Sequence, residues 1–136
     1  QMKKIEVVAA IIKHKDEILS VQRPHHKLDY ISEKFEFPGG KIEVGETREQ
    51  ALNRELKEEL EINADIGKHV ITVEHGYPEF ELTMHTYIVN VDSKDITLNE
   101  HISQLWLTKE DIYSVDWAAA DIPIVDKLNS IEWQTL

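Results

Sequence analysis

The chain has 136 residues, of which 41% are hydrophobic and 30% charged, with a formal net charge of −11 and no cysteine. This length and composition predict one soluble globular domain over residues 1–136. The acidic charge argues against a nucleic acid polymer as partner, no apolar run approaches the roughly 20 residues of a membrane span, and the lack of cysteine excludes disulfides and thiolate metal sites.

The start of the chain shows no signal peptide pattern, because Lys3 and Lys4 lead directly into a strand pattern. Gln1 is interpreted as a remnant ahead of the native start, Met2. We therefore expect a cytoplasmic protein that binds no membrane. A small phosphorylated ligand is compatible with the acidic charge if divalent cations lie between protein and ligand.

Residues 4–12 are apolar and rich in β-branched side chains, which predicts a buried strand. A polar turn over 14–17 separates it from an alternating segment, 18–22, so the two segments should form a hairpin. The polar segment 24–34 is expected to be a surface loop. Residues 35–40 (FEFPGG) should form a short extended piece that ends at proline and two glycines.

The clearest predicted helix covers residues 48–60, which no glycine or proline interrupts. Thr47 and Gln50 have the spacing of a capping box, which would fix the start of this helix.

Later segments predict further strands and two shorter helices. Strands are expected over 69–73, 80–91 and 102–107, a turn over 76–78, a short helix capped by Thr108, and a C-terminal helix over 122–128. The order of strands and helices lacks strict βαβ alternation, so the fold class is α/β (α+β), with a mixed sheet between helices. The seven histidines lack the paired spacing of zinc ligands and are expected at surface or strand positions.

Two stripes run along the predicted helix. An apolar stripe, which should pack on the sheet, consists of Leu52, Leu56 and Leu60. The adjacent stripe carries the carboxylates of Glu55, Glu58 and Glu59, which repel one another by about a few tenths of a kcal/mol per exposed pair. A hard divalent cation with oxygen ligands would remove this repulsion, and the alternative is a solvated acidic helix face.

The segment from Gly40, GKIEVGETREQALNRELKEELEI, places its glycine and glutamates at a distinctive spacing. It resembles the Nudix box, the 23-residue loop–helix signature of hydrolases that act on nucleoside diphosphate-linked compounds. One position departs from that pattern, because Glu61 stands where the family usually has glycine. Glu61 must either adopt a left-handed conformation, at roughly 1–2 kcal/mol, or let the helix end differently.

Flanking segments extend the resemblance over essentially the whole chain and towards the MutT-like branch of the family. They are VVAAIIKHKDEILSVQRP, FEFPGGK, LNEH, WLTKEDI and WAAADIPIV. The resemblance implies the Nudix fold and hydrolysis of nucleoside triphosphates to the monophosphate and pyrophosphate. It also implies Mg²⁺ as cofactor, with Mn²⁺ as a substitute, and a small-molecule nucleotide as substrate.

The resemblance assigns roles to individual residues. The implied metal ligands are the carbonyl of Gly39 and the carboxylates of Glu55, Glu58, Glu59 and Glu100. Arg54 should hold the carboxylates by charged hydrogen bonds, with Glu46 as its support. Lys41 and Arg23 are the candidates for contacting phosphate. For Glu100 the alternative is an exposed loop acid, and for Arg23 a surface cation at a strand end.

Recognition of the base is assigned first to Asp121, which precedes the last predicted helix. Its carboxylate would accept hydrogen bonds from exocyclic amines, and a protonated carboxyl could also donate. The alternative is that Asp121 is the N-cap of that helix. Phe37, Tyr77 and Phe80 are candidates for stacking on the base, with a place in the core as the alternative.

Three functions are compatible with these residues. The leading prediction is a MutT-like hydrolase of the 8-oxo-dGTP/dGTP or CTP/dCTP class. The alternatives are a hydrolase of ADP-ribose or a nucleotide sugar, and a catalytically silent nucleotide-binding domain. The last is disfavoured because all the glutamates of the box are present. Either a monomer or a homodimer is expected.

Overall fold

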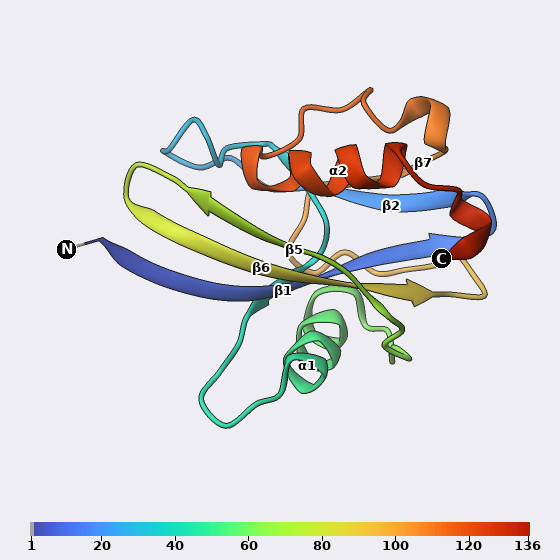
Figure 1. The fold of residues 1–136 in the computed structure, drawn as a ribbon, viewed down its shortest axis with the longest axis horizontal. Helices are drawn as coiled ribbons and strands as arrows, with labels where there is room; N and C mark the ends of the chain where they lie inside the picture. Colours follow the sequence, from blue (N-terminus) through green and yellow to red (C-terminus); the bar gives the residue numbers. More distant parts are fainter. Residues whose placement is uncertain (1) are drawn as a thin grey trace.

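A mixed β-sheet with helices on both faces forms the centre of the fold (Figure 1). The computed structural model describes residues 2–136, so Gln1, interpreted above as a remnant, lies outside the described residues. In this part of the chain the strands are β1 (Lys3–His14), β2 (Glu17–Gln22), β3 (Phe35–Glu36), β4 (Gly39–Lys41), β5 (His69–Gly76), β6 (Phe80–Asn90) and β7 (Ser103–Leu107). The strand order is β3-β2-β1-β6-β5, while β4 pairs with β1 and β7 pairs with β2.

One α-helix covers each face of this sheet (Figure 1). They are α1 (Arg48–Leu60) and α2 (Ile122–Asn129), accompanied by 3₁₀ turns at Lys109–Asp111, Ala119–Asp121 and Trp133–Thr135. The predicted mixed sheet between helices is therefore confirmed. Over residues 2–136, no helix is both long enough and apolar enough to cross a bilayer.

The central strand β1 is buried on both sides because its successive apolar residues point to opposite faces. Val8, Ala10 and Ile12 belong to the hydrophobic cluster under α1, whereas Ala9 and Ile11 belong to the cluster under α2. β1 pairs in parallel with β6 from Lys3 opposite Phe80 to Lys13 opposite Asn90. This long parallel pair is the platform that carries both helices.

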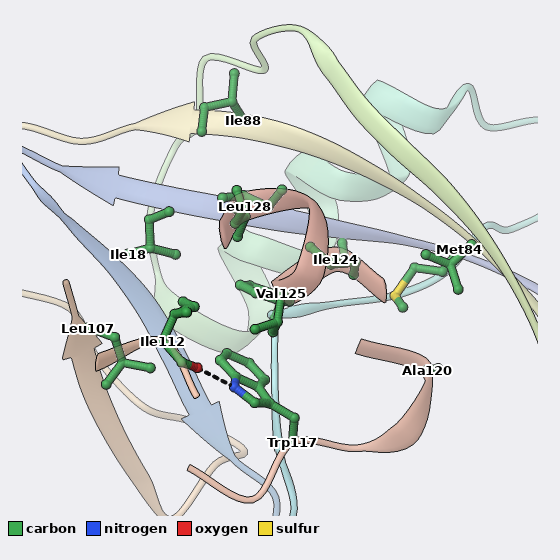
Figure 2. Packing of buried hydrophobic residues seen from close by; sticks show 14 of the residues in the cluster. Ile18, Met84, Ile88, Leu107, Ile112, Trp117, Ala120, Ile124, Val125 and Leu128 are labelled. Atoms are coloured by element: carbon green, nitrogen blue, oxygen red, sulfur yellow. Dashed lines mark hydrogen bonds between the residues drawn. The ribbon is translucent and has the colours of Figure 1, made fainter. Parts of the chain in front are cut away.

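The side chains of α2 complete the core on its face of the sheet. Figure 2 shows Ile124, Val125 and Leu128 among the side chains of this cluster, close to Ile112 and Trp117. The indole N–H of Trp117 donates to the Ile112 carbonyl oxygen over 2.7 Å, so even the polar atom of this ring is satisfied inside the core.

Helix α1 starts and ends at the predicted residues. The Gln50 backbone N–H donates to Thr47 Oγ1, and the Thr47 N–H donates to Gln50 Oε1, which completes the capping box. At the other end Glu61 adopts φ 56° and ψ 38°, and its N–H points to the carbonyls of Leu56 and Lys57. Glu61 therefore takes the left-handed conformation that the family's glycine would provide, and the alternative of a different helix end is wrong.

The prediction that the Thr108 side chain caps a short helix is wrong. The segment after β7 is a 3₁₀ turn, and the Thr108 side chain makes no capping bond to its backbone. Thr108 Oγ1 instead donates to Asp111 Oδ2 over 3.0 Å. The Thr108 hydroxyl thus donates to a side chain three residues ahead, and no backbone N–H of the turn donates to its oxygen.

Replacing Glu61 with glycine should stabilise the fold, because glycine adopts the left-handed conformation without a steric cost. We expect a gain of about 1 kcal/mol, or a rise in Tm of roughly 4 °C in a thermal melt. Glu61→Ala removes the same charge but keeps the steric cost, so it serves as the control and should not raise Tm. Equal stabilisation by both variants would show that charge, and not backbone conformation, is the cause.

Candidate active site

The apolar stripe of α1 positions Glu55 against strand β4. Leu52, Leu56 and Leu60 are fully buried, and their packing on the sheet fixes the rotation of the helix. Glu55 then lies directly over Gly40, where a Cβ atom would overlap its carboxylate. The small residue at position 40 thus allows the helix carboxylate to reach the strand backbone.

An acidic cavity of about 180 Å³ lies beside this contact. It is lined by Arg23, Pro24, Glu36, Gly39, Glu55, Glu59, Glu100 and His101. The structure thus brings together four of the five expected metal ligands, from β4, α1 and the loop before β7. Glu58 is the exception, because its side chain is 55% exposed and does not line the cavity.

Arg54 holds the helix and the preceding loop together through its guanidinium group. Its Nε and Nη2 donate to the two oxygens of Glu46 over 2.7 and 2.9 Å. Nη1 donates to Glu55 Oε1 over 2.9 Å, and Nη2 also donates to the Lys41 carbonyl oxygen over 3.0 Å. A planar fork with several donors suits this task better than a lysine ammonium would.

This network orients the Glu55 carboxylate and lowers the pKa of Glu46. The hydrogen bond from Arg54, followed by that from the Glu43 backbone, lowers the pKa of Glu46 to about 2. The side chain of Glu58 lies farther out, with Oε2 3.6 Å from Arg54 Nη1. Of the three glutamates in the predicted acidic stripe, Arg54 therefore contacts Glu55 and Glu58 but not Glu59.

Within residues 2–136, Glu59 has no arginine or lysine partner, only His101 Nε2 at 3.8 Å, and it is 4% exposed. Burial raises the pKa of its carboxyl to about 10, and the hydrogen bond and charge of Glu55, together with the charges of Glu36 and Glu100, act in the same direction. Uncompensated carboxylates in a buried cavity are unfavourable unless a proton or a cation neutralises them. The electrostatics of the cavity thus favour a bound cation.

The donor atoms of the cavity suit a hard divalent cation. In residues 2–136, no three histidine or acidic side chains converge into a ready-made metal cage. Mg²⁺, however, is usually held by only one or two carboxylates and keeps several waters and substrate phosphates as ligands. Glu55, Glu59 and Glu100 supply carboxylate oxygens around one space, and Gly39 lines the same space. The residues present therefore fit a hard divalent cation.

Three residues that line the acidic cavity were not anticipated as site residues, namely Pro24, Glu36 and His101. Glu36 Oε1 lies 3.3 Å from Arg23 Nη1, and Glu36 Oε2 lies 2.9 Å from His101 Nε2. The His101 side chain is 5% exposed and its Nε2 is 3.8 Å from Glu59 Oε1. The expectation of a surface or strand histidine is therefore wrong for His101. The segments FEFPGGK and LNEH contain Glu36 and His101, but only tertiary packing reveals that they meet.

A second, largely apolar cavity of about 340 Å³ adjoins the acidic one. The two cavities share Arg23, Glu36 and Gly39, which line both. The apolar walls come mainly from the ends of β1 and β6, from the loop between β2 and β3, and from the residues before α2. Lys41 lines this cavity and not the acidic one. A ligand with one apolar end and one end that binds a cation would match this pair of cavities.

Asp121 lies buried at the wall of the apolar cavity. Its Oδ1 accepts a hydrogen bond from the Phe37 N–H over 3.1 Å, and its side chain makes no capping bond to α2. Asp121 thus occupies the N-cap position of α2, as the alternative expected, but its side chain does not cap the helix because the carboxylate accepts from Phe37 instead. Burial raises the pKa of Asp121 well above its ordinary value, and the charge of Glu36 acts in the same direction.

The expected aromatic residues differ in their exposure. Phe37 is 3% exposed and stacks on Trp117 with ring centroids 4.7 Å apart, so most of its ring belongs to the core. Tyr77 is partly exposed and stacks on Tyr30 at 5.1 Å. Phe80 tilts against Tyr77 at the same centroid distance. All four of Phe37, Tyr30, Tyr77 and Phe80 line the apolar cavity.

Comparisons with known proteins agree with this geometry. The family model for the NUDIX domain matches residues 2–128. A CTP pyrophosphohydrolase from Escherichia coli strain K12 is 37% identical over 92% of this chain and 91% of its own length. An 8-oxo-dGTP diphosphatase from the same organism is 29% identical, covering 96% of this chain and 100% of its own. The solution structure of the E. coli ORF135 protein superposes with a TM-score of 0.80 at 37% identity, covering 93% of this chain and 89% of that one.

A methyl group at position 40 should disturb the site without disturbing the fold. In Gly40→Ala the new methyl displaces the flexible end of Glu55, so Mn²⁺ affinity measured by calorimetry should fall about tenfold. Tm should change little. Gly39→Ala is the matched comparison, because its methyl overlaps the Val8 backbone oxygen and should destabilise the fold by about 2 kcal/mol. Wild-type Mn²⁺ affinity in a folded Gly40→Ala protein would contradict the assignment of Glu55.

Proposed function

The chain belongs to the NUDIX domain family, and on this premise we propose that it hydrolyses nucleoside triphosphates to the monophosphate and pyrophosphate. The observation that carries the proposal is the pair of adjoining cavities, one acidic and one apolar, that share Arg23, Glu36 and Gly39. A nucleotide has the same division between a polyanionic end and a flat, largely apolar base. Two relatives named for CTP and for 8-oxo-dGTP support this substrate class.

The phosphate end of the substrate is assigned to the acidic cavity. Gly39, Glu55, Glu59 and Glu100 would hold Mg²⁺ there, or Mn²⁺ in its place, with Glu58 at the rim. When bound, the cation supplies charge neutralisation of the phosphates and a more acidic water for in-line attack on phosphorus. Without this compensation, the carboxylates would repel the phosphates of any nucleotide.

Side chains around the acidic cavity would position the phosphate end of the substrate. Arg54 fixes the position of Glu55 and is itself held by both oxygens of Glu46. Arg23 lines both cavities, and its contact with Glu36 holds it where the phosphate chain would pass from one to the other. Preorganised charges of this kind act without the reorganisation that water would need.

His101 is assigned a positioning role in the same network. A carboxylate only accepts hydrogen bonds, so the 2.9 Å contact with Glu36 places a proton on His101 Nε2. His101 thereby ties Glu36 to the loop that carries Glu100. The contact links the loop before β7 to strand β3.

The base is assigned to the apolar cavity, with Asp121 as the polar group that reads it. One oxygen of Asp121 is engaged by the Phe37 N–H, which leaves the rest of the carboxyl group for the ligand. Because burial raises its pKa, this carboxyl can carry a proton and donate a hydrogen bond as well as accept one. That combination suits the carbonyl and amine groups of guanine, 8-oxoguanine or cytosine.

Activity over a nucleotide panel tests the function. With Mg²⁺, we expect pyrophosphate release from one or more of CTP, dCTP, dGTP and 8-oxo-dGTP, loss of release in EDTA, and recovery with Mn²⁺. Glu55→Gln should lower kcat by about 10²-fold or more, because a charge next to the reacting phosphate is lost. Glu61→Gln, which removes an exposed charge outside both cavities, is the matched control and should retain kcat. Full activity in EDTA would exclude the metal-dependent reaction.

Asp121→Asn tests the assignment of the base. Asparagine keeps the size and can still accept the Phe37 N–H, but it cannot carry the carboxyl proton. The relative kcat/KM values within the panel should change by roughly tenfold, the effect of about one hydrogen bond. The ratio for a ribonucleotide and its deoxy counterpart should stay constant. An unchanged ranking of the bases would remove Asp121 from base recognition.

A further inference from the structure

Tyr30 lies in the loop between β2 and β3, where it forms part of the wall of the apolar cavity. Its ring is stacked on Tyr77, with centroids 5.1 Å apart and planes 16° from parallel. Its hydroxyl oxygen is buried, yet it has no hydrogen-bond partner among residues 2–136. Buried hydroxyl groups are almost always hydrogen-bonded, so this oxygen requires an explanation.

The partner in the stack provides an internal comparison. The Tyr77 oxygen accepts a hydrogen bond from the Ala120 N–H over 2.9 Å, so its polar group already serves the fold. The Tyr30 hydroxyl serves no such purpose, and phenylalanine would stack on Tyr77 equally well. Tyr30 lines the cavity while its hydroxyl oxygen is enclosed, so a ligand there would reach the unpaired hydroxyl after a small rotation of the side chain.

We propose that Tyr30 is a specificity-determining residue, whose hydroxyl forms a hydrogen bond with the nucleobase in the apolar cavity. This inference rests on the proposed function and names a second polar contact besides Asp121. Tyr30 does not line the acidic cavity, and neither does Tyr77. The stacked pair therefore lies away from the phosphate end, on the side where the base would bind.

Such a contact would select between bases for a simple reason. A phenol hydroxyl both donates and accepts, so it can pair with a carbonyl oxygen, a ring nitrogen or an exocyclic amine. A base that places a polar atom opposite it satisfies the hydroxyl, whereas a base that presents a C–H leaves it unpaired. The loop thus contributes to the choice of base without touching the phosphates.

The experiment compares wild type and Tyr30→Phe over CTP, dCTP, GTP, dGTP and 8-oxo-dGTP with Mg²⁺. KM for the preferred base should rise about tenfold, the effect of one lost hydrogen bond, while kcat stays within about twofold. KM for the poorest base should change least. Tm should not fall, because the hydroxyl removed has no partner in the protein.

Two further variants separate the hydroxyl from other effects. Tyr113→Phe removes an exposed phenol that bonds to Asp126 outside both cavities, and it should leave every KM unchanged. Tyr30→Leu also removes the ring and the stack, so its KM values should rise for all bases. A base-selective loss in Tyr30→Phe against a general loss in Tyr30→Leu would support the hydroxyl contact.

The outcomes distinguish this inference from the function on which it rests. A wild-type protein that hydrolyses none of the panel would overturn the proposed function, and this inference with it. An active Tyr30→Phe enzyme with wild-type KM values would overturn this inference alone. A loss equal for all bases, or one confined to ribonucleotides, would also overturn it, because the hydroxyl would then act on the stack or the sugar.

Discussion

The close approach of helix α1 to strand β4 is the constraint on which the site depends. The leucine stripe of the helix is buried against the sheet, and Gly40 leaves room for the Glu55 carboxylate above the strand backbone. Once this contact is made, the next turn of the helix places Glu59 in the same cavity as Glu36 and Glu100. The packing of apolar side chains that take no part in the chemistry thus determines where four carboxylates meet.

The arrangement is costly for the fold and useful for the reaction. The raised pKa of Glu59 means that its carboxyl binds a proton more tightly in the folded chain than in the unfolded one. Its contribution to stability is therefore full below its ordinary pKa near 4.5 and is lost as pH rises towards 10. At neutral pH the folded chain therefore keeps this carboxyl protonated, and ionising it without a bound cation would be unfavourable. Glu46 behaves in the opposite way, because Arg54 lowers its pKa and stabilises it as an anion.

The local features of the fold could be predicted from sequence because each depends on neighbouring residues. The capping box of α1 and the alternation in β1 are local, and the spacing of the box glutamates follows from the helical repeat. The exposure of Glu58 and the burial of His101 could not be predicted in this way. Both depend on which face of a segment meets a strand or helix distant in sequence. The hydrogen bond of Asp121 could not be predicted for the same reason. Aspartate at the start of a helix often caps it, but here the carboxylate accepts from Phe37, 84 positions away.

The two cavities also explain why the reaction is easier to predict than the substrate. The acidic cavity draws two of its four carboxylates, Glu55 and Glu59, from one helix, so their spacing can be recognised in the sequence. The apolar cavity is assembled from strand ends, the loop that carries Tyr30 and the turn that carries Asp121. Loops tolerate substitution and insertion more readily than a packed helix does. Under the proposed assignment, changes in the loop that carries Tyr30 would alter the preferred base, while Gly40 and the helix carboxylates would leave the phosphate end unchanged.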